Sequence, residues 1–573
     1  MGTISDKLMR IISTKEDIRQ ALISKGYDVP TSIPFKEYAK MILDLPCKAD
    51  SFPDIEGIVA RYSASGLTNE QMAANPVWVD KTGNGHDLQL KNFSWKGMSG
   101  IGGYVADIDE WGTNSTAAYF ERNSIKITAT FKENASLGLL YHNIKLRQFC
   151  VLKVTGIPEG CDAFLDDRLG NRFYMSEDGV YEIIPSNFLA EALYFSIEKY
   201  PEGWYGSKLT IEQLPLYPGA LVFDGVDDYG VCDNFPILTK EKGYTVVALR
   251  QWITYNPNVI SAIATNASDQ SFNGAFTFEN YNKGAEQTIS YGATQISLQY
   301  SKSPFSWQTT SKYNGVNIAN GNKDATNSLV LGRSYPQRND FANFAIWELV
   351  FLDHDATEEE LTKIKDYFVK TYPWLFPDQA WTVVGKTNED EDRATIANIT
   401  GNGNDLVLSN FGFAEGSGYN EEGEYAGYLV TDGVDDKIIS SIFKMGNDWT
   451  VIGDWELINT GKNDNAGIVK FDSIVIYNYN SMLINIKNGR NILIPDQNTV
   501  NAICSDGRIY SKDWKESIYN EETESTSKNF LTIGYSGNAY TKIAFKNLAI
   551  YPTVLSREDC IKAYNYLQTL KAK

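Results

Sequence analysis

The chain lacks several features that would place it quickly in a functional class. Its 573 residues include only six cysteines and three histidines, with no C-x-x-C pair. This argues against a zinc cluster and a disulfide scaffold, so buried free thiols are expected. The three histidines, His86, His142 and His354, do not indicate a Ser-His-Asp triad or a histidine-based metal site. No glycine-rich loop leads from a strand into a helix, so nucleotide binding is not supported.

Long apolar runs and positive charge are also scarce. The longest apolar run, at 341–352, is too short to span a bilayer, and the polar N-terminus does not read as a secretory signal. The formal net charge is −20, from 72 acidic and 52 basic side chains. Because this charge repels phosphate backbones and anionic lipid, we expect no nucleic-acid partner and no membrane insertion.

What the sequence does contain is a repeat. The phrase TGNGHDLQLKNF at 82–93 returns as TGNGNDLVLSNF at 400–411, and LVFDGVDDYG at 221–230 returns as LVTDGVDDKI at 429–438. The two phrases keep their order, which predicts a duplicated domain. The first copy has a much longer stretch between its phrases, and the excess has the size of an inserted domain.

A strand followed by a helix closes each copy. Thr357 with Glu360, and Ser556 with Asp559, have the spacing of a helix-capping box. Each such helix is expected to pack against a sheet of its own domain. Between these landmarks, short segments rich in branched and aromatic residues alternate with Gly, Asn and Asp turns, a pattern that predicts packed antiparallel sheets in a jelly-roll topology.

The recurring DGVDD phrase has two interpretations. In the structural one, Asp224 and Asp432 accept backbone N–H bonds two residues on, while Gly225 and Gly433 take a positive φ. Gly83, Gly85, Gly401 and Gly403 would build turns in the same way in the TGNG phrases. In the functional one, Asp224, Asp227 and Asp228 present oxygens to calcium. The dense alternating ligand pattern of a dedicated calcium loop is missing, so the sequence predicts turns and no cofactor.

These phrases resemble the concanavalin A-like lectin/glucanase superfamily and, within it, the laminin-G-like domains. WVDKTGNGHDL at 78–88 and FDGVDDY at 223–229 carry the resemblance in the first copy. The second copy departs from the pattern at Ile399 and Lys437. The resemblance implies two concanavalin A-like antiparallel β-sandwiches (jelly roll). Alternating apolar residues in the excess stretch predict a small inserted β-sandwich, so we expect a mainly β chain with a short helical N-terminal module. The predicted domains are 1–50; 51–111 plus 219–375; 112–218; and 376–573.

The first 50 residues differ from the rest. Capping spacing and a glycine stop predict a helix at 14–25, and Phe35, Tyr38 and Ile42 form the apolar stripe of a second helix. So short a unit buries little by itself and is expected to dock on a partner or on copies of itself. The stretch resembles the leading segment of fibre-type and tail-associated virion proteins of crAss-like phages of gut Bacteroidales. This implies attachment to other virion proteins, a homo-oligomer, and assembly in the host cytoplasm without a signal peptide.

Two function hypotheses follow. The first is a non-enzymatic virion fibre or decoration protein, in head or tail, whose lectin-like domains attach to host-surface glycans. Trp204 and Tyr205, on a glycine-flanked loop, are candidates for stacking on a sugar, or else anchor their own loop.

The second hypothesis is a glycan-cleaving depolymerase on the same scaffold. Asp107 and Asp109 alternate as glucanase acids do, but Trp111 stands where a third acid should follow, so no catalytic residue is predicted. The acidic stretch NEDEDR at 388–393 is interpreted as a solvated turn.

Overall fold

The computed structural model forms two units, 1–54 and 55–573, and only the second contains the elements discussed below. The description covers residues 52–570 and Ala572. Apart from gaps of one or two residues, it omits 106–117, 133–142, 146–149, 158–161, 167–170, 184–191, 199–205, 239–242, 255–260, 268–276, 281–294, 303–305, 310–324, 334–339, 442–445, 459–466, 479–481, 487–489, 495–499 and 519–530. The helices predicted in the first 50 residues therefore lie outside the described residues.

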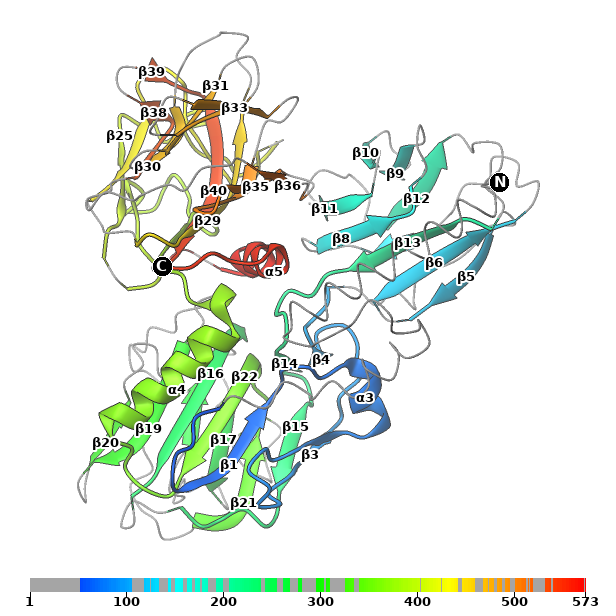
Figure 1. Cartoon of the computed structure of the whole chain (residues 1–573), viewed down its shortest axis with the longest axis vertical. Helices are drawn as coiled ribbons and strands as arrows, with labels where there is room; N and C mark the ends of the chain where they lie inside the picture. Colours follow the sequence, from blue (N-terminus) through cyan, green and yellow to red (C-terminus); the bar gives the residue numbers. More distant parts are fainter. Residues whose placement is uncertain are drawn as a thin grey trace, which may run out of the picture. The chain divides into compact units, whose positions relative to one another are not determined.

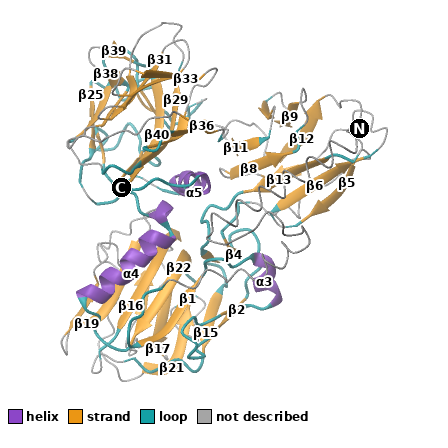
Figure 2. Ribbon diagram, in the orientation of Figure 1, coloured by secondary structure: helices purple, strands orange, loops and turns teal. Residues whose placement is uncertain are grey.

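The fold is mainly β, as predicted, and all its described strand pairs are antiparallel (Figure 2). The described helices are α3 (Asn69–Ala74), α4 (Glu358–Thr371), α5 (Arg557–Leu567) and the short 3₁₀ helix η3 (Pro373–Leu375). No helix in the described part of the chain has both the length and the apolar character needed to cross a membrane.

The first sandwich consists of two sheets. In spatial order, one sheet contains β20 (Ser306–Thr309), β19 (Gln295–Lys302), β16 (Thr245–Thr254), β22 (Asn343–Leu352), β14 (Leu221–Asp224) and β4 (Gly100–Ile101), with β1 (Ile58–Ser63) also paired to β22. The other contains β18 (Thr277–Asn280), β17 (Ser261–Ala267), β21 (Ala325–Leu331), β15 (Tyr229–Cys232), β3 (Leu88–Lys91) and β2 (Val77–Trp78). Leu90 and Leu331 from one sheet and Phe344 from the other share a single core.

The second sandwich repeats this plan. One sheet runs β26 (Gly418–Tyr419), β27 (Leu429–Val430), β40 (Ile543–Tyr551), β29 (Thr450–Leu457), β34 (Val500–Cys504), β35 (Arg508–Ser511) and β36 (Glu516–Ile518), with β23 (Gln379–Thr382) also paired to β40. The other runs β24 (Thr395–Ile396), β25 (Leu406–Ser409), β28 (Lys437–Ser440), β37 (Leu531–Ile533), β30 (Gly467–Phe471), β31 (Ile474–Asn478), β32 (Met482–Ile486) and β33 (Arg490–Ile494). A small hairpin joins β38 (Tyr535–Ser536) to β39 (Ala539–Tyr540).

Strand order matches between the two copies. The order β4-β14-β22-β16-β19-β20 corresponds to β26-β27-β40-β29-β34-β35, and β2-β3-β15-β21-β17-β18 corresponds to β24-β25-β28-β37-β30-β31. Even an irregularity is shared, because the pairing register shifts at Leu249/Arg250 in one copy and at Asp454/Trp455 in the other. The duplication seen in two short phrases therefore extends over both sheets of each sandwich.

The inserted sandwich pairs its strands only among themselves, within the described residues. One sheet contains β11 (Gly179–Ile183), β8 (Cys150–Thr155), β13 (Lys208–Gln213), β6 (Lys126–Phe131) and β5 (Ala118–Arg122), and the other β10 (Arg172–Met175), β9 (Asp162–Asp166), β12 (Ala192–Glu198) and β7 (Asn143–Lys145) (Figure 1). Leu165 and Val154, one from each sheet, meet in its core. The exact limits of the four predicted domains stay predictions.

The capping box of the first closing helix forms as the spacing predicts. Thr357 Oγ1 accepts the N–H of Glu360, whose side chain accepts the N–H of Thr357, so α4 begins at Glu358. Tyr367 and Phe368 of α4 are buried beneath it, and a buried Arg61–Glu348 ion pair of 3.4 Å lies against Tyr367. This network holds α4 on its own sandwich, as expected.

The α5 helix begins in the same manner, since Ser556 Oγ accepts the N–H of Asp559. It packs on its own sandwich through Tyr564 and Trp514, whose ring centroids are 5.6 Å apart. It also contacts the first copy, because Lys562 Nζ lies 4.5 Å from the centre of the Trp374 ring in η3. The expectation that this helix packs on its own domain is confirmed, and the contact with η3 is additional.

The cysteines match the expectation where they are described. Cys150, Cys232, Cys504 and Cys560 are buried and form no disulfide. Burial raises the pKa of the Cys150 and Cys232 thiols, which keeps them in the unreactive protonated form. Cys47 and Cys161 lie outside the described residues.

Candidate functional site

Each sandwich presents an acidic loop, which we define as residues 224–228 in the first copy and 432–436 in the second. Asp224 Oδ1 accepts the N–H of Val226 at 2.8 Å, and Asp432 Oδ1 accepts the N–H of Val434 at 2.7 Å. Gly225 takes a φ of 76°, and a Cβ there would come within 2.7 Å of the Asn343 Cβ. Glycine is thus required both by conformation and by space.

The second glycine occupies matching surroundings. Gly433 has a φ of 75°, and a Cβ there would lie 3.0 Å from the backbone nitrogen of Lys542, just before β40. In the first copy the corresponding neighbour, Asn343, begins β22, the strand equivalent to β40. The two loops are therefore built against the same strand of their sandwich.

A buried carboxylate closes each acidic loop. Asp228 Oδ2 accepts the N–H of Asp224 at 3.0 Å, and Asp436 Oδ2 accepts the N–H of Asp432 at 2.8 Å. Both side chains are fully buried. Desolvation raises the pKa of Asp228 to about 7 and that of Asp436 to about 6, although the backbone N–H bonds act in the opposite direction.

The hydroxyl partner of this carboxylate comes from a distant part of the chain. Ser99 Oγ donates to Asp228 Oδ1 at 3.0 Å and itself accepts the N–H of Ser94. In the second copy Ser417 Oγ accepts the N–H of Gly412 at 2.8 Å. Ser417 also lowers the pKa of Asp436, although burial outweighs it.

These serines belong to a companion loop, which we define as residues 92–99 and 410–417. Asn92 Nδ2 donates to the carbonyl of Asp227, and Asn410 Nδ2 donates to the carbonyl of Asp435, each at 3.0 Å. Both asparagines have a positive φ, of 67° and 70°. Each acidic loop is thus fixed from outside as well as by its own bonds.

A second asparagine pair anchors the companion loops. Asn69 Oδ1 accepts the N–H of Ile101 at 2.7 Å, and its Nδ2 donates to the carbonyl of the same residue. Asn388 makes the same two bonds to Tyr419, each at 2.8 Å. The stretch 388–393 forms a turn with exposed Glu389, Glu391 and Asp392, as predicted, while Asn388 is half-buried at its start.

Sequence reasoning missed these anchors although a signal exists. The letters TNE at 68–70 recur at 387–389, in each case a short distance along the chain before the TGNG phrase. In the first copy they start α3 through a Thr68–Gln71 capping box, whereas in the second Thr387 and Asp390 exchange similar bonds within a turn.

The TGNG loops have a structural role. Asp80 is almost fully buried, and its Oδ1 accepts the N–H groups of Arg61 and Thr82, each at 3.0 Å. Asn398 takes its place in the second copy and accepts the N–H of Thr400 at 3.0 Å. Gly83, Gly85, Gly401 and Gly403 all have φ between 73° and 81°.

The exchange of His86 for Asn404 is explained by the same loop. Tyr62 Oη donates to the backbone carbonyl of His86, and Trp381 Nε1 donates to the backbone carbonyl of Asn404. Because the contact uses the backbone, either side chain fits. This contact therefore does not depend on the identity of the side chain at the position.

The acidic loops bring carboxylates close together. One oxygen from each of Asp224, Asp227 and Asp228 lies within 4.8 Å of the others, and the second loop repeats this with Asp432, Asp435 and Asp436. Such oxygens suit calcium. However, Asp224 Oδ1 and both oxygens of Asp228 already accept hydrogen bonds, which is what a turn requires.

The outer side of each loop is exposed and partly apolar. Val226 and Val434 are 69% and 71% exposed, and the neighbouring Asp227 and Asp435 are exposed too. On the inner side, Phe93 and Trp95 of the companion loop stack at 4.8 Å between ring centroids and pack half-buried against the core. Each sandwich therefore offers a rigid tip that combines carboxylate and apolar groups.

Most of the remaining candidates lie outside the part of the chain that the structure describes. Trp204, Tyr205, Asp107, Asp109, Phe35, Tyr38 and Ile42 lie outside the described residues, as does His142. His354 lies before α4, with its ring nitrogens 3.3 Å from Asp353 and Glu360.

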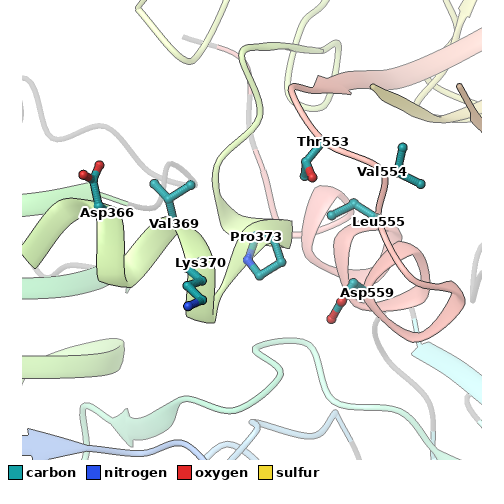
Figure 3. Close-up of a pocket in the computed structure, with 8 residues that line it drawn as sticks. All are labelled: Asp366, Val369, Lys370, Pro373, Thr553, Val554, Leu555 and Asp559. Atoms are coloured by element: carbon teal, nitrogen blue, oxygen red, sulfur yellow. The ribbon is translucent and has the colours of Figure 1, made fainter. Parts of the chain in front are cut away.

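An open cavity of about 340 Å³ lies between α4 and the chain that leads into α5 (Figure 3). Val369, Pro373 and Leu555 supply much of its apolar wall. Figure 3 shows that the charged ends of Asp366, Lys370 and Asp559 do not converge on a common point. The cavity therefore lacks the convergent polar groups expected of a chemical site.

No protein-family model and no curated protein matches the chain. Among solved structures, a Trypanosoma rangeli sialidase in complex with sialic acid is 9% identical at a TM-score of 0.22, covering 79% of this chain and 83% of its own. The botulinum neurotoxin serotype G binding domain is 8% identical at 0.20, covering 57% and 94%. The binding domain of Paraclostridial Mosquitocidal Protein 1 is 9% identical at 0.22, covering 56% and 85%. Likenesses at these TM-scores carry no argument about fold or function.

Proposed function

We propose that the chain is a non-enzymatic virion protein, a head or tail fibre or decoration, that displays lectin-like sandwiches for attachment to host-surface glycans. The observation that carries the proposal is the duplicated tip, in which an acidic loop braced by a companion loop recurs in both sandwiches. The virion part is supported by the wording of the first 50 residues, which resembles that of fibre-type virion proteins.

The chemistry of the tip suits a sugar. Exposed carboxylates such as Asp227 and Asp435 accept hydrogen bonds from hydroxyl groups, and the adjacent valines offer an apolar surface to the ring carbons. The bracing bonds hold these groups in place before a ligand arrives, which reduces the entropy lost on binding. A small, rigid and partly apolar surface of this kind favours a ligand that has an apolar ring face as well as hydroxyl groups.

Duplication gives such a surface its value. A single shallow sugar contact is weak, but two linked contacts bind with an avidity that can exceed either affinity by roughly 10²–10⁴. Display in many copies on a particle extends the same effect. The gain requires that both sandwiches keep the tip, and they do.

The alternative is a depolymerase on this scaffold. Glycosidases need two carboxyl groups on either side of the scissile bond, about 5–5.5 Å or 6.5–9.5 Å apart. In the acidic loops one carboxylate, Asp228 or Asp436, is fully buried and committed to a backbone N–H, which makes it unsuitable as a nucleophile. A catalytic role would therefore fall to Asp107 and Asp109.

Binding to bacterial surface polysaccharide by the full chain tests the proposal. We expect Asp227→Ala and Asp435→Ala each to weaken retention in an affinity gel several-fold, and the double variant to lose it. Glu56→Ala and Glu422→Ala, which remove exposed carboxylates outside the loops, are matched controls.

Three results would count against the proposal. Undiminished binding by the double variant would move the contact away from the acidic loops. Failure of the unmodified chain to bind any host polysaccharide would overturn glycan attachment. Absence of its peptides from purified particles, measured by mass spectrometry, would overturn the virion role.

A further inference from the structure

Exposed aromatic rings are concentrated in the inserted sandwich. Among the side chains whose exposure the structure describes, Tyr119 and Tyr174 are the aromatic residues with large exposure, at 67% and 50%. Both belong to this insert, on β5 and β10. The two larger sandwiches bury or half-bury their described aromatic residues.

Tyr174 lies on the outer face of its sheet. In the β10–β9 pairing, Arg172 is opposite Asp166 and Tyr174 is opposite Phe164, while Met175 faces the core. Side chains alternate along a strand, so Arg172 and Tyr174 share the face turned away from the core. Among the described strands, β10 lies at the edge of its sheet, and half of the Tyr174 side chain is exposed.

This outer face has a built aromatic base. Phe164 points away from the core, yet only 1% of it is exposed. Arg172 covers it, with the guanidinium carbon 4.5 Å from the ring centre, and Tyr174 lies beside it, with 5.5 Å between ring centroids. The tyrosine ring therefore rests on a packed layer and does not swing freely.

An ion pair borders the ring. Arg172 Nε donates to Asp166 Oδ2 at 3.0 Å, and Nη1 lies 3.5 Å from Tyr174 Oη. The arginine side chain is 40% exposed and the aspartate 18%. We define Asp166, Arg172 and Tyr174 together as the Tyr174 patch.

We propose that the Tyr174 patch binds a neutral pyranose unit of a polysaccharide, an inference that rests on the glycan attachment proposed above. The apolar face of a pyranose ring stacks on the tyrosine, and neighbouring hydroxyls bond to the paired carboxylate and guanidinium. A neutral sugar fits because the ion pair has no net charge. A nucleic-acid base would also stack, but its phosphates would meet a chain of net charge −20.

The test uses the full chain in affinity gels that contain laminarin, yeast mannan or larch arabinogalactan, which present three neutral hexoses. Tyr174→Ala is expected to raise the dissociation constant for the retained polysaccharide by up to about tenfold, because the variant loses the ring on which the sugar stacks. Tyr174→Phe keeps the ring and should remain within about threefold of the unmodified chain.

Tyr119→Ala is the matched control, since Tyr119 is also an exposed tyrosine of the same insert but carries the Lys132 ammonium 4.4 Å from its ring centre. It should bind as the unmodified chain does. Unchanged far-ultraviolet circular dichroism and melting temperature show that each variant is folded.

The outcomes separate the two proposals. If the unmodified chain is retained and Tyr174→Ala is retained equally well, the patch is not a sugar site, while glycan attachment stands. If Tyr119→Ala and Tyr174→Ala weaken binding alike, exposed aromatic surface on the insert contributes without regard to position. The proposal for the Tyr174 patch is then also overturned. If none of the polysaccharides nor bacterial surface glycan retains the unmodified chain, both proposals fail.

Discussion

At the scale of single residues, burial decides how the acidic loops behave. Asp224 with Gly225, and Asp432 with Gly433, could be predicted from sequence because a tight turn is a local structure. The partners of the buried carboxylate could not, since Ser99 is 129 residues from Asp228 along the chain. The sequence around a loop serine does not indicate which distant carboxylate its hydroxyl will bond.

The buried carboxylates predict a pH dependence of stability. The folded-state pKa of Asp228, about 7, lies above the value near 4 of an exposed aspartate, so the folded state binds the proton more tightly. Its contribution to stability is present below about pH 4 and is lost as the pH rises through about 7. We expect Asp228→Asn to reduce the dependence of the melting temperature on pH between pH 4 and 8. The exposed Asp227→Asn is the control. An unchanged pH profile in Asp228→Asn would contradict this.

His354 predicts a second titration. Burial acts to lower its pKa, but the hydrogen bonds and charges of Asp353 and Glu360 outweigh burial and raise the pKa above the usual value near 6.5. The charged form therefore stabilises the folded state at low pH, and this contribution fades as the pH rises above the folded pKa. Proton NMR should show the His354 imidazole titrating above 6.5 and returning toward that value in Glu360→Gln. A titration of His354 at or below 6.5 in the unmodified chain would refute the contact.

At the scale of elements, features set by local sequence could be predicted, whereas features set by long-range contacts could not. The sequence predicts where α4 and α5 begin, because each start is marked by a hydroxyl residue followed three residues later by a carboxylate. The α3 helix carries the same signal at Thr68 and Gln71 but has only six residues, and the copy replaces it with a turn. The positive φ of Trp95 and Phe413 has no sequence signal, because bulky residues rarely adopt it.

The companion loop predicts a sensitive glycine. Gly100 has a φ of 137°, and a Cβ there would lie 2.5 Å from Asn69 Oδ1, the atom that fixes the loop. Gly100→Ala should therefore lower the melting temperature of the first sandwich, at a cost of about 1–3 kcal/mol. Gly66→Ala, with a φ of 78° and open space around it, measures the cost of conformation alone. Equal losses in the two variants would mean that the contact with Asn69 is unimportant.

At the scale of the whole molecule, the duplication was the feature that the sequence indicated most clearly. Two short phrases in the same order predicted two like domains, and the matching strand orders extend that likeness to both sheets. The shared bulge and the asparagine anchors were not visible, because they depend on which strands become neighbours. Among the described residues, β32, β33 and β36 of the second copy have no counterpart in the first, and the repeated phrases do not predict them.

The N-terminal segment predicts the assembly state. Residues 1–50 contain an expected apolar stripe, Phe35, Tyr38 and Ile42, that so short a unit cannot bury within itself. A chain lacking residues 1–50 should therefore be monomeric, whereas the full chain should be an oligomer. Light scattering coupled to size-exclusion chromatography measures both masses. A truncated chain that keeps the mass of the full oligomer would move the contact into the sandwiches.

The most direct test of the account follows bound protein and new reducing ends in the same mixture of full chain and bacterial surface polysaccharide. Attachment without chemistry predicts saturable binding while the number of reducing ends stays constant over time. A steady rise in reducing ends that disappears in Asp107→Asn or Asp109→Asn would show that the scaffold cleaves the glycan, and would contradict the account.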